Sequence, residues 1–260
     1  MQVDISSLKI RALFISDFHL GFRLANAKGA LAMLQQVKTP LLYLVGDTID
    51  YTRLLKHWYW PGSCEKVIEQ LETLRQSGIE MRVCPGNHDK CLRDDSFISQ
   101  TESTDPDSTD QMARVFSSIL KMDLAESFIH ETADGRRLLV THGDRHDDFH
   151  QRTGGVTTLG TRIFDHMLWW LPKYVVLMLR RTFKMILANP RHIEKKIVQD
   201  AKSQKLDGVI FGHIHTPSLS TVDGFITANT GDWVENQSFL AELEDGKLVL
   251  INTNRELATA

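Results

Sequence analysis

The chain has 260 residues, of which 42% are hydrophobic and 24% are charged, a composition typical of a folded globular protein rather than a disordered one. This length is compatible with one large α/β domain, or with a domain that carries a substantial insertion. The formal net charge of −3 provides no general electrostatic attraction to nucleic acid, so we expect no nucleic-acid partner.

Several features of the sequence favour a cytoplasmic location. No apolar run reaches the roughly 18 residues of a membrane-spanning helix, and the N-terminal segment lacks the apolar core of a signal peptide. The three cysteines, Cys64, Cys84 and Cys91, form no C-x-x-C pair and are odd in number, which favours reduced thiols. We therefore expect a soluble cytoplasmic protein, or one that rests on a membrane surface.

Strands and helices alternate in the first part of the chain. Short apolar runs predict three buried strands, over residues 11–16, 41–45 and 80–84. Helical patterns lie between them, over residues 25–37 and 63–76, and Ser63 is the expected N-cap of the second helix. Residues 96–110 are rich in Ser, Thr and Asp and predict a loop.

The second part begins with a helix predicted over residues 111–122, capped by Ser108 or Asp110. A hairpin follows, with strands over residues 128–132 and 137–141. Residues 154–205 have a helical pattern, and we interpret them as a cap inserted into a single domain that spans residues 1–260. The chain then returns to strand over residues 207–211 and ends in antiparallel strands.

Five apolar runs end in residues that can bind metal ions. Ligands bind at the carboxyl ends of strands in open α/β folds, and carboxylate, amide and imidazole groups that converge there can hold two divalent metals. The five tips are Ser16-Asp17-Phe18-His19, Gly46-Asp47-Thr48-Ile49-Asp50, Gly86-Asn87-His88-Asp89, Thr141-His142-Gly143-Asp144 and Gly212-His213-Ile214-His215.

In their order and spacing, the five tips resemble the signature of the calcineurin-like metallophosphoesterases, which is D-x-H, G-D-x-x-D, G-N-H-D/E, a single His and G-H-x-H. The resemblance implies an α/β sandwich of two mixed sheets flanked by helices. It also implies that Asp47 bridges two metals, and that the other ligands are Asp17, His19 and His215 for one metal and Asn87, His142 and His213 for the second.

The same resemblance implies a reaction. A side-chain amide beside carboxylates and histidines suits Mn²⁺, Fe or Zn²⁺ more than Ca²⁺, and Mn²⁺ is our first expectation. A hydroxide that bridges the metals would attack phosphorus in line. His88 has the family's position for protonating the leaving oxygen, and Asp50 would orient it. Asp89, Asp144 and Asp232 are expected to brace loops or ligands.

The stretch over residues 163–188 is apolar and aromatic, and it carries a basic stripe of Lys173, Arg180 and Lys184. One interpretation is a helix that docks its apolar face on the body of the protein. The other is an amphipathic cap that contacts lipid or holds acyl chains, with cations near anionic head groups. Together with Arg53 and Trp58, the three basic residues are our expected substrate contacts.

A closer resemblance concerns the substrate. The stretches Trp58-Tyr59-Trp60-Pro61, His130-Glu131-Thr132-Ala133-Asp134-Gly135 and Asn229-Thr230-Gly231-Asp232-Trp233 are similar to the UDP-2,3-diacylglucosamine diphosphatases of lipid A synthesis. This implies hydrolysis of the pyrophosphate of a lipid-linked nucleotide sugar, with peripheral contact to the inner membrane.

One position departs from that group, because its best-known enzymes carry Arg where this chain has His88. A phosphate leaving group needs little protonation, whereas an alkoxide does. His88 therefore leaves open a general phosphodiesterase or phosphatase. A separate alternative is a non-catalytic scaffold that keeps the fold but has lost its metals, and the presence of every expected ligand disfavours it.

Overall fold

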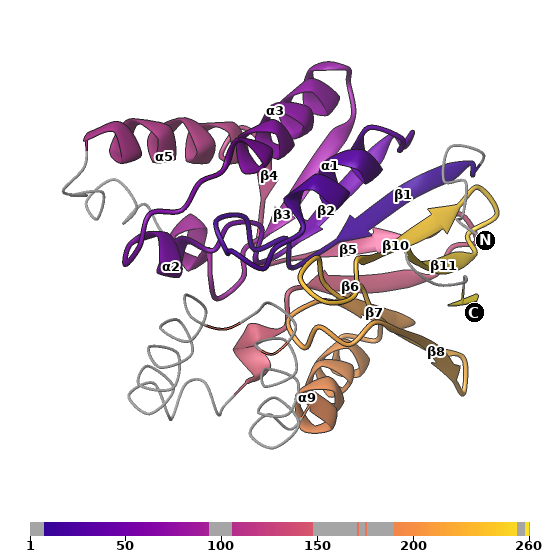
Figure 1. Ribbon diagram of the computed structural model, residues 1–260. Helices are drawn as coiled ribbons and strands as arrows, with labels where there is room; N and C mark the ends of the chain where they lie inside the picture. The colour runs from indigo at the N-terminus through magenta and orange to yellow at the C-terminus, as the bar shows by residue number, and fades with distance from the viewer. Residues whose placement is uncertain are drawn as a thin grey trace.

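The protein is described by a computed structural model over residues 8–93, 106–147, 171, 175, 190–253 and 258–259. Two β-sheets are stacked face to face, with helices on their outer faces (Figure 1). The expected sandwich of two mixed sheets flanked by helices is confirmed. In the described part of the chain, no helix has both the length and the hydropathy that crossing a membrane requires.

The first sheet has seven strands in the order β12-β11-β10-β1-β2-β3-β4. Strands β1, β2 and β3 are parallel, so their carboxyl ends lie at the same edge. On the other side of β1, strands β10 and β11 continue the sheet in antiparallel pairs. The strands are β1 (Ile10–Ile15), β2 (Leu41–Val45), β3 (Glu80–Cys84), β4 (Asp123–Leu124), β10 (Ser238–Leu243), β11 (Leu248–Asn252) and β12 (Ala258–Thr259).

The second sheet has five strands in the order β5-β6-β7-β9-β8. Its central strands β6, β7 and β9 are parallel, so the segments that follow β6 and β7 also leave the sheet at one edge. The strands are β5 (Ser127–Glu131), β6 (Arg137–Thr141), β7 (Gly208–Phe211), β8 (Ser218–Val222) and β9 (Phe225–Asn229).

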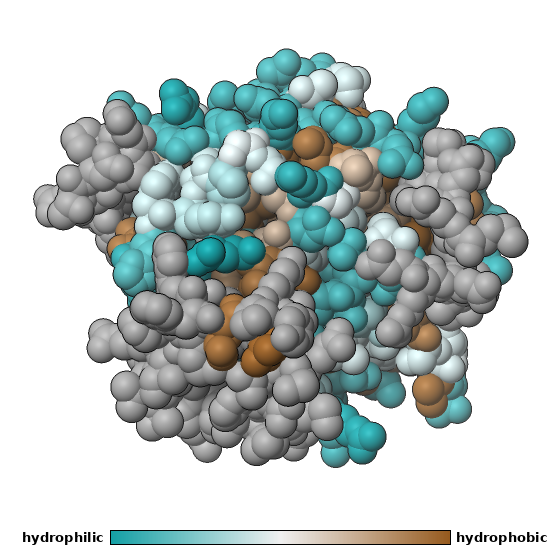
Figure 2. Space-filling view, viewed as in Figure 1, coloured by the Kyte–Doolittle hydropathy of each residue, from teal (hydrophilic) through white to brown (hydrophobic). Residues whose placement is uncertain are grey.

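Helices cover the outer face of each sheet (Figure 1). The first sheet is covered by α1 (Ala27–Leu34), α3 (Gly62–Gln76) and α5 (Pro106–Ile119), and the second by α9 (Pro190–Ser203). Short helices α2 (Tyr51–Leu54), η2 (Lys90–Arg93) and η3 (Asp144–His146) follow strands β2, β3 and β6. Seen from the side of Figure 1, most of the coloured surface is hydrophilic, and hydrophobic residues form small patches (Figure 2).

The spacing of apolar residues explains why these helices dock. Helix α3 buries Val67, Leu71 and Leu74, which recur every three or four residues and so lie on one face. Helix α9 does the same with Ile193 and Ile197, which pack in a cluster with residues of β7. These helices stabilise the sheets from outside, while a separate apolar cluster fills the space between the sheets.

A buried polar group also joins the two sheets. The fully buried Glu242 on β10 accepts hydrogen bonds from Arg11 Nη1 at 2.9 Å, from His130 Nε2 at 2.8 Å and from the backbone N–H of Ala133 at 2.7 Å. Arg11 lies near the start of β1, at the opposite end from Asp17. This ion pair therefore fixes the sheets together far from the carboxyl ends of the strands.

Several element boundaries differ from those predicted. Helix α5 starts at Pro106, so residues 106–110 are helical rather than loop, and neither Ser108 nor Asp110 is its N-cap. Proline suits the first turn of a helix, because its missing N–H would have no intrahelical partner there. Ser63 is also not an N-cap, since Pro61 holds that position and its carbonyl accepts from Cys64 N.

The predicted cap over residues 154–205 lies largely outside the described residues. Its last part forms α9, which packs against the second sheet. Residues 154–189 are not described except for Leu171 and Val175, and the expected substrate contacts Lys173, Arg180 and Lys184 fall in that segment. The interpretation of this stretch as a cap stays a prediction.

Candidate metal centre

The structure brings the five strand-end segments to one place. Asp17 follows β1, Asp47 follows β2 and His142 follows β6, so the site lies where the carboxyl ends of both sheets meet. Hydrogen bonds join the segments, including Asp17 N to Gly46 O at 3.0 Å and His213 N to Asp17 Oδ2 at 3.1 Å. Five residues of the motifs have left-handed backbone with φ between 48° and 65°, namely Asp17, His19, Asp47, His213 and His215.

Glycines allow the segments to approach so closely. A Cβ on Gly46 would collide with the imidazole of His142, and a Cβ on Gly86 would collide with the carboxylate of Asp47. A Cβ on Gly212 would lie 2.7 Å from Asp17 Oδ2. Each of these three glycines therefore borders a predicted ligand from a different segment.

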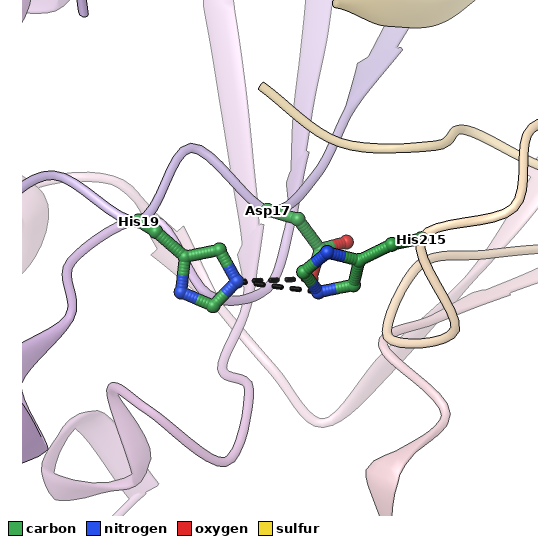
Figure 3. A group of neighbouring side chains, drawn as sticks. All are labelled: Asp17, His19 and His215. Carbon is green, nitrogen blue, oxygen red and sulfur yellow. Dashed lines mark hydrogen bonds and ion pairs between the residues drawn. The ribbon is translucent and has the colours of Figure 1, made fainter. Parts of the chain in front are cut away.

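Asp17, His19 and His215 form the first cluster of predicted ligands (Figure 3). His215 Nε2 lies 3.0 Å from Asp17 Oδ1, and the same nitrogen lies 3.3 Å from His19 Nε2. The two imidazoles therefore face each other beside one carboxylate, and all three side chains are buried. Such a group of one oxygen and two nitrogen ligands suits a divalent transition metal.

Asp47 lies between this cluster and His142, and Asp17, Asp47 and His142 form the second cluster of predicted ligands. Asp47 Oδ2 is 3.8 Å from His19 Nε2 on one side and 3.4 Å from His142 Nε2 on the other. His142 donates from Nδ1 to the carbonyl of Val45 at 2.9 Å, which directs Nε2 towards Asp47. This central position of Asp47 is the one that a bridging carboxylate needs.

His213 contacts the second cluster through its ring, whose centroid lies 5.2 Å from that of His142. Its Nε2 lies 3.1 Å from Asp147 Oδ2, a contact that sequence reasoning missed. Asp147 belongs to no motif, and its separation of 66 positions from His213 left no local signal. A carboxylate on one nitrogen of a ligating histidine orients its ring and sets its tautomer.

His88 and Asp50 form a pair next to the first cluster. His88 Nδ1 lies 2.8 Å from Asp50 Oδ1, and the side chain of His88 is 25% exposed, so ligands can reach it. The other oxygen of Asp50 lies 3.0 Å from Arg53 Nε and 3.4 Å from His19 Nδ1. Asp50 thus holds the predicted acid and a predicted metal ligand at once.

The expected substrate contacts Arg53 and Trp58 have different surroundings. Arg53 pairs with Asp50 and lies 4.4 Å above the ring of Phe22, so it borders the site. Trp58 stacks on Trp60 with ring centroids 6.2 Å apart and packs against the main core. Trp60 Nε1 donates to Glu65 at 2.7 Å. The aromatic pair therefore has a role in packing.

Two of the expected bracing residues also join segments. Asp89 accepts from Thr48 N at 2.7 Å and from Gly86 N at 2.6 Å, which ties the segments after β2 and β3 together. Burial, reinforced by the charge of Asp47, raises the pKa of Asp89 to about 6. Asp232 accepts from the backbone of Val234 at 2.7 Å and lies 3.7 Å from His215 Nδ1.

The charges in the site are strongly coupled. Burial raises the pKa of the Asp17 carboxyl, but His215 and His19 lower it further, to well below its usual value. Burial also raises the pKa of Asp47, but His142 and His88 outweigh this effect and lower the pKa below its usual value. Against the effect of burial, Asp17 and Asp50 raise the pKa of His19 to about 9, and Asp47 raises that of His142 to about 10.

The donor atoms fit a metal pair. Asn87 Oδ1 is buried and has no hydrogen-bond partner within the described ranges, while Asp17 Oδ1 and His142 Nε2 are buried against other predicted ligands, His215 Nε2 at 3.0 Å and Asp47 Oδ2 at 3.4 Å, without a well-aligned hydrogen bond. A buried polar atom without a partner is unfavourable by about 1–3 kcal/mol. All three atoms belong to residues that the motifs assign to metals, and a bound cation would satisfy them.

The chain is similar to several solved structures and matches one family model. A search of curated proteins found no match. Among solved structures, the chain is similar to YfcE, a phosphoesterase from E. coli, at 16% identity and a TM-score of 0.48, covering 96% of this chain and 97% of that chain. A second similarity is to Vps29 of Entamoeba histolytica complexed with Zn²⁺, at 14% identity and a TM-score of 0.46, covering 96% of each chain.

A third solved structure is a conserved uncharacterized protein of Streptococcus pneumoniae described as a predicted phosphoesterase, at 12% identity and a TM-score of 0.42, covering 96% of this chain and 98% of that chain. These scores are too low to support any conclusion about function. The family model for the calcineurin-like phosphoesterases, in contrast, matches residues 10–217, which include all five motifs. The chain belongs to the calcineurin-like phosphoesterase family.

Proposed function

We propose that this protein is a hydrolase of phosphate esters or phosphoanhydrides that uses two divalent metal ions, with Mn²⁺ as the first expectation. The observation that carries the proposal is the convergence of Asp17, Asp47 and His142, whose ligand atoms lie within 4.8 Å of one another. Such a pair of ions, when bound, supplies positive charge for the phosphoryl oxygens and acidifies a water nucleophile.

The protein's own part in the reaction is to position ligands and protons. Asp47 lies between the two clusters and holds them at a fixed separation. Asp50 accepts a hydrogen bond from Nδ1 of His88 at 2.8 Å, which orients the ring and leaves Nε2 as the atom that can donate a proton to the leaving oxygen. This donor assists most when the leaving group is an alkoxide, so His88 favours ester substrates over anhydrides.

A lipid-linked nucleotide sugar such as UDP-2,3-diacylglucosamine is the narrower proposal. Its support is the similarity of sequence around Trp58 and Asp232 and the basic, aromatic composition of residues 163–188. With this substrate, the protein would act in the cytoplasm at the surface of the inner membrane. Loss of the metals during divergence would instead make it a scaffold, and the donor set that is present argues against this.

One substrate panel tests these proposals. Protein loaded with Mn²⁺ is assayed on p-nitrophenyl phosphate, bis(p-nitrophenyl) phosphate and UDP-2,3-diacylglucosamine, with bound metal measured on the same preparation. We expect about two metals per chain and hydrolysis of at least one substrate, abolished in Asp47→Asn. The matched control is Asp134→Asn, which changes a carboxylate on the surface hairpin.

The outcomes separate the candidates. Release of UMP from the lipid substrate alone supports the narrower proposal, and turnover of the simple esters alone replaces it with a general phosphoesterase. Absence of bound metal together with absence of hydrolysis of any substrate would favour the scaffold.

A further inference from the structure

Arg93 is a partly buried residue that belongs to none of the five motifs. It ends helix η2, and its side chain is 19% exposed. Nη1 donates to Asp144 Oδ2 and Nη2 donates to Asp144 Oδ1, both at 2.8 Å, so the guanidinium binds the carboxylate in a bidentate manner. Nη2 also donates to the carbonyl of Pro85 at 2.8 Å. Charge-assisted pairs of this kind are strong and directional.

The partners of Arg93 lie on different sheets. Pro85 follows β3 of the first sheet and stands two residues before Asn87, whereas Asp144 follows β6 of the second and stands two residues after His142. Glu126, before β5, lies 2.9 Å from Arg93 Nε and extends the contact along the second sheet. Arg93 therefore joins the two segments that carry Asn87 and His142.

A direct role in substrate binding fits this geometry poorly. Both terminal nitrogens of the guanidinium bond to protein oxygens, and Asp144 neutralises its charge. A phosphate that approached Arg93 would have to replace a bidentate carboxylate. These contacts directly constrain the distance between the segment that follows β3 and the segment that follows β6.

We propose that Arg93 is a positioning residue that sets the separation of Asn87 and His142, and thereby the affinity of the second metal position. The inference rests on the proposed function, since it assumes that these two residues bind the same ion. In the described part of the chain, Arg93 contacts Asp144, Pro85 and Glu126, none of which belongs to the first cluster, so the cluster of Asp17, His19 and His215 keeps its affinity when Arg93 changes.

Titration with Mn²⁺ followed by calorimetry tests the inference without any substrate. Arg93→Lys keeps the positive charge but loses the planar guanidinium that binds the carboxylate through two nitrogens. In this variant, we expect one equivalent of Mn²⁺ to bind as in the parent and the second to bind about 10–100-fold more weakly. Asp144→Asn should give the same selective loss. The double variant should lose little more than either single one, because both changes break one interaction.

Arg11→Lys is the matched control, because Arg11 also pairs with a carboxylate, that of Glu242, and reaches the second sheet through the carbonyl of Glu131, but at the opposite end of the strands. It should lower the melting temperature and leave both metal affinities unchanged. Equal affinities in Arg93→Lys and the parent would overturn the inference, and so would an equal loss at both positions. A parent that binds fewer than two metals would overturn the proposed function as well.

Should Arg93→Lys fail to fold, Asp144→Asn alone decides. That variant preserves the size of the side chain and one acceptor oxygen for the guanidinium. Selective weakening of the second equivalent supports the inference, and unchanged binding of both equivalents rejects it.

Discussion

The backbone at the site is strained where the predicted ligands lie. Among the described residues, eight other than glycine have a positive φ, and five of them belong to the metal-binding motifs. Such conformations are unfavourable by about 1–3 kcal/mol each and persist when their surroundings over-determine them. Here hydrogen bonds between segments do so, for example His19 N to Asp47 O at 2.9 Å. The strain thus marks residues whose side chains must point at a common centre.

His88 gives a prediction at this scale. His88→Ala should lower kcat for alkyl phosphate esters by about 10²–10⁴-fold, because the leaving alkoxide loses its proton donor. The loss should be much smaller for p-nitrophenyl phosphate, whose leaving group is a weak base. Plots of kcat against the pKa of the leaving alcohol, together with metal analysis, measure the effect.

The control for that series is His57→Ala, since His57 is an exposed histidine that belongs to none of the five motifs. It should leave every rate within about twofold of the parent. A uniform loss in His88→Ala across all leaving groups would show that His88 acts on something other than the departing oxygen.

Gly86 gives a second prediction. Gly86→Ala should abolish metal binding and destabilise the fold by about 1–3 kcal/mol, because the added Cβ meets the Asp47 carboxylate and lies 2.6 Å from the Asp47 backbone nitrogen. Gly62→Ala is the matched control, as a Cβ there meets nothing within 4 Å. Urea unfolding and metal titration of both variants check this, and a normal Mn²⁺ stoichiometry in Gly86→Ala would contradict it.

At the scale of elements, the predictability of the strands follows from their burial. Strands β2 and β3 match the predicted ranges, because β2 is a short apolar run and β3 alternates charged residues with the buried Met81 and Val83. The start of α5 was missed because Ser, Thr and Asp favour loops by composition but do not prevent a helix. Long-range partners such as Arg93 with Asp144, 51 residues apart, have no local pattern at all.

The ion pair between the sheets gives a prediction at this scale. Glu242→Gln should lower the free energy of unfolding at pH 7 by about 3 kcal/mol, since His130 and Arg11 lose a charged acceptor. Burial raises the pKa of Glu242, but His130, Ala133 and Arg11 lower it further, to below its usual value. Its stabilisation is therefore present above the ordinary pKa of Glu and is lost as the pH falls through the folded pKa.

Urea unfolding at pH 7 and pH 3 measures the difference in the free energy of unfolding between the parent and Glu242→Gln. This difference should shrink at the lower pH. Glu244→Gln serves as the control, because Glu244 pairs with Lys9 on the surface with both side chains mostly exposed. We expect it to change stability by less than about 0.5 kcal/mol. A difference for Glu242→Gln that is the same at both pH values would contradict a charged role for Glu242.

For the whole molecule, the site couples metal binding, protonation and stability. The pKa values of His19 and His142 are raised to about 9 and about 10. In the metal-free protein, these histidines therefore stabilise the fold in their charged form. That contribution is complete below the ordinary histidine pKa of about 6.5 and is lost as the pH rises through 9 to 10. A metal needs the neutral imidazole, so it competes with those protons.

Mn²⁺ binding at pH 7.5 should therefore release protons, up to one from each of the two histidines, and its affinity should rise steeply with pH until about pH 10. Calorimetry in two buffers with different ionisation enthalpies counts these protons. Saturating Mn²⁺ should also raise the melting temperature, and by more at pH 8.5 than at pH 6.5, because only the folded chain binds it tightly. Histidines with ordinary pKa values would release almost no protons at pH 7.5, and that result would contradict the charge coupling that Asp17 and Asp47 create in this site.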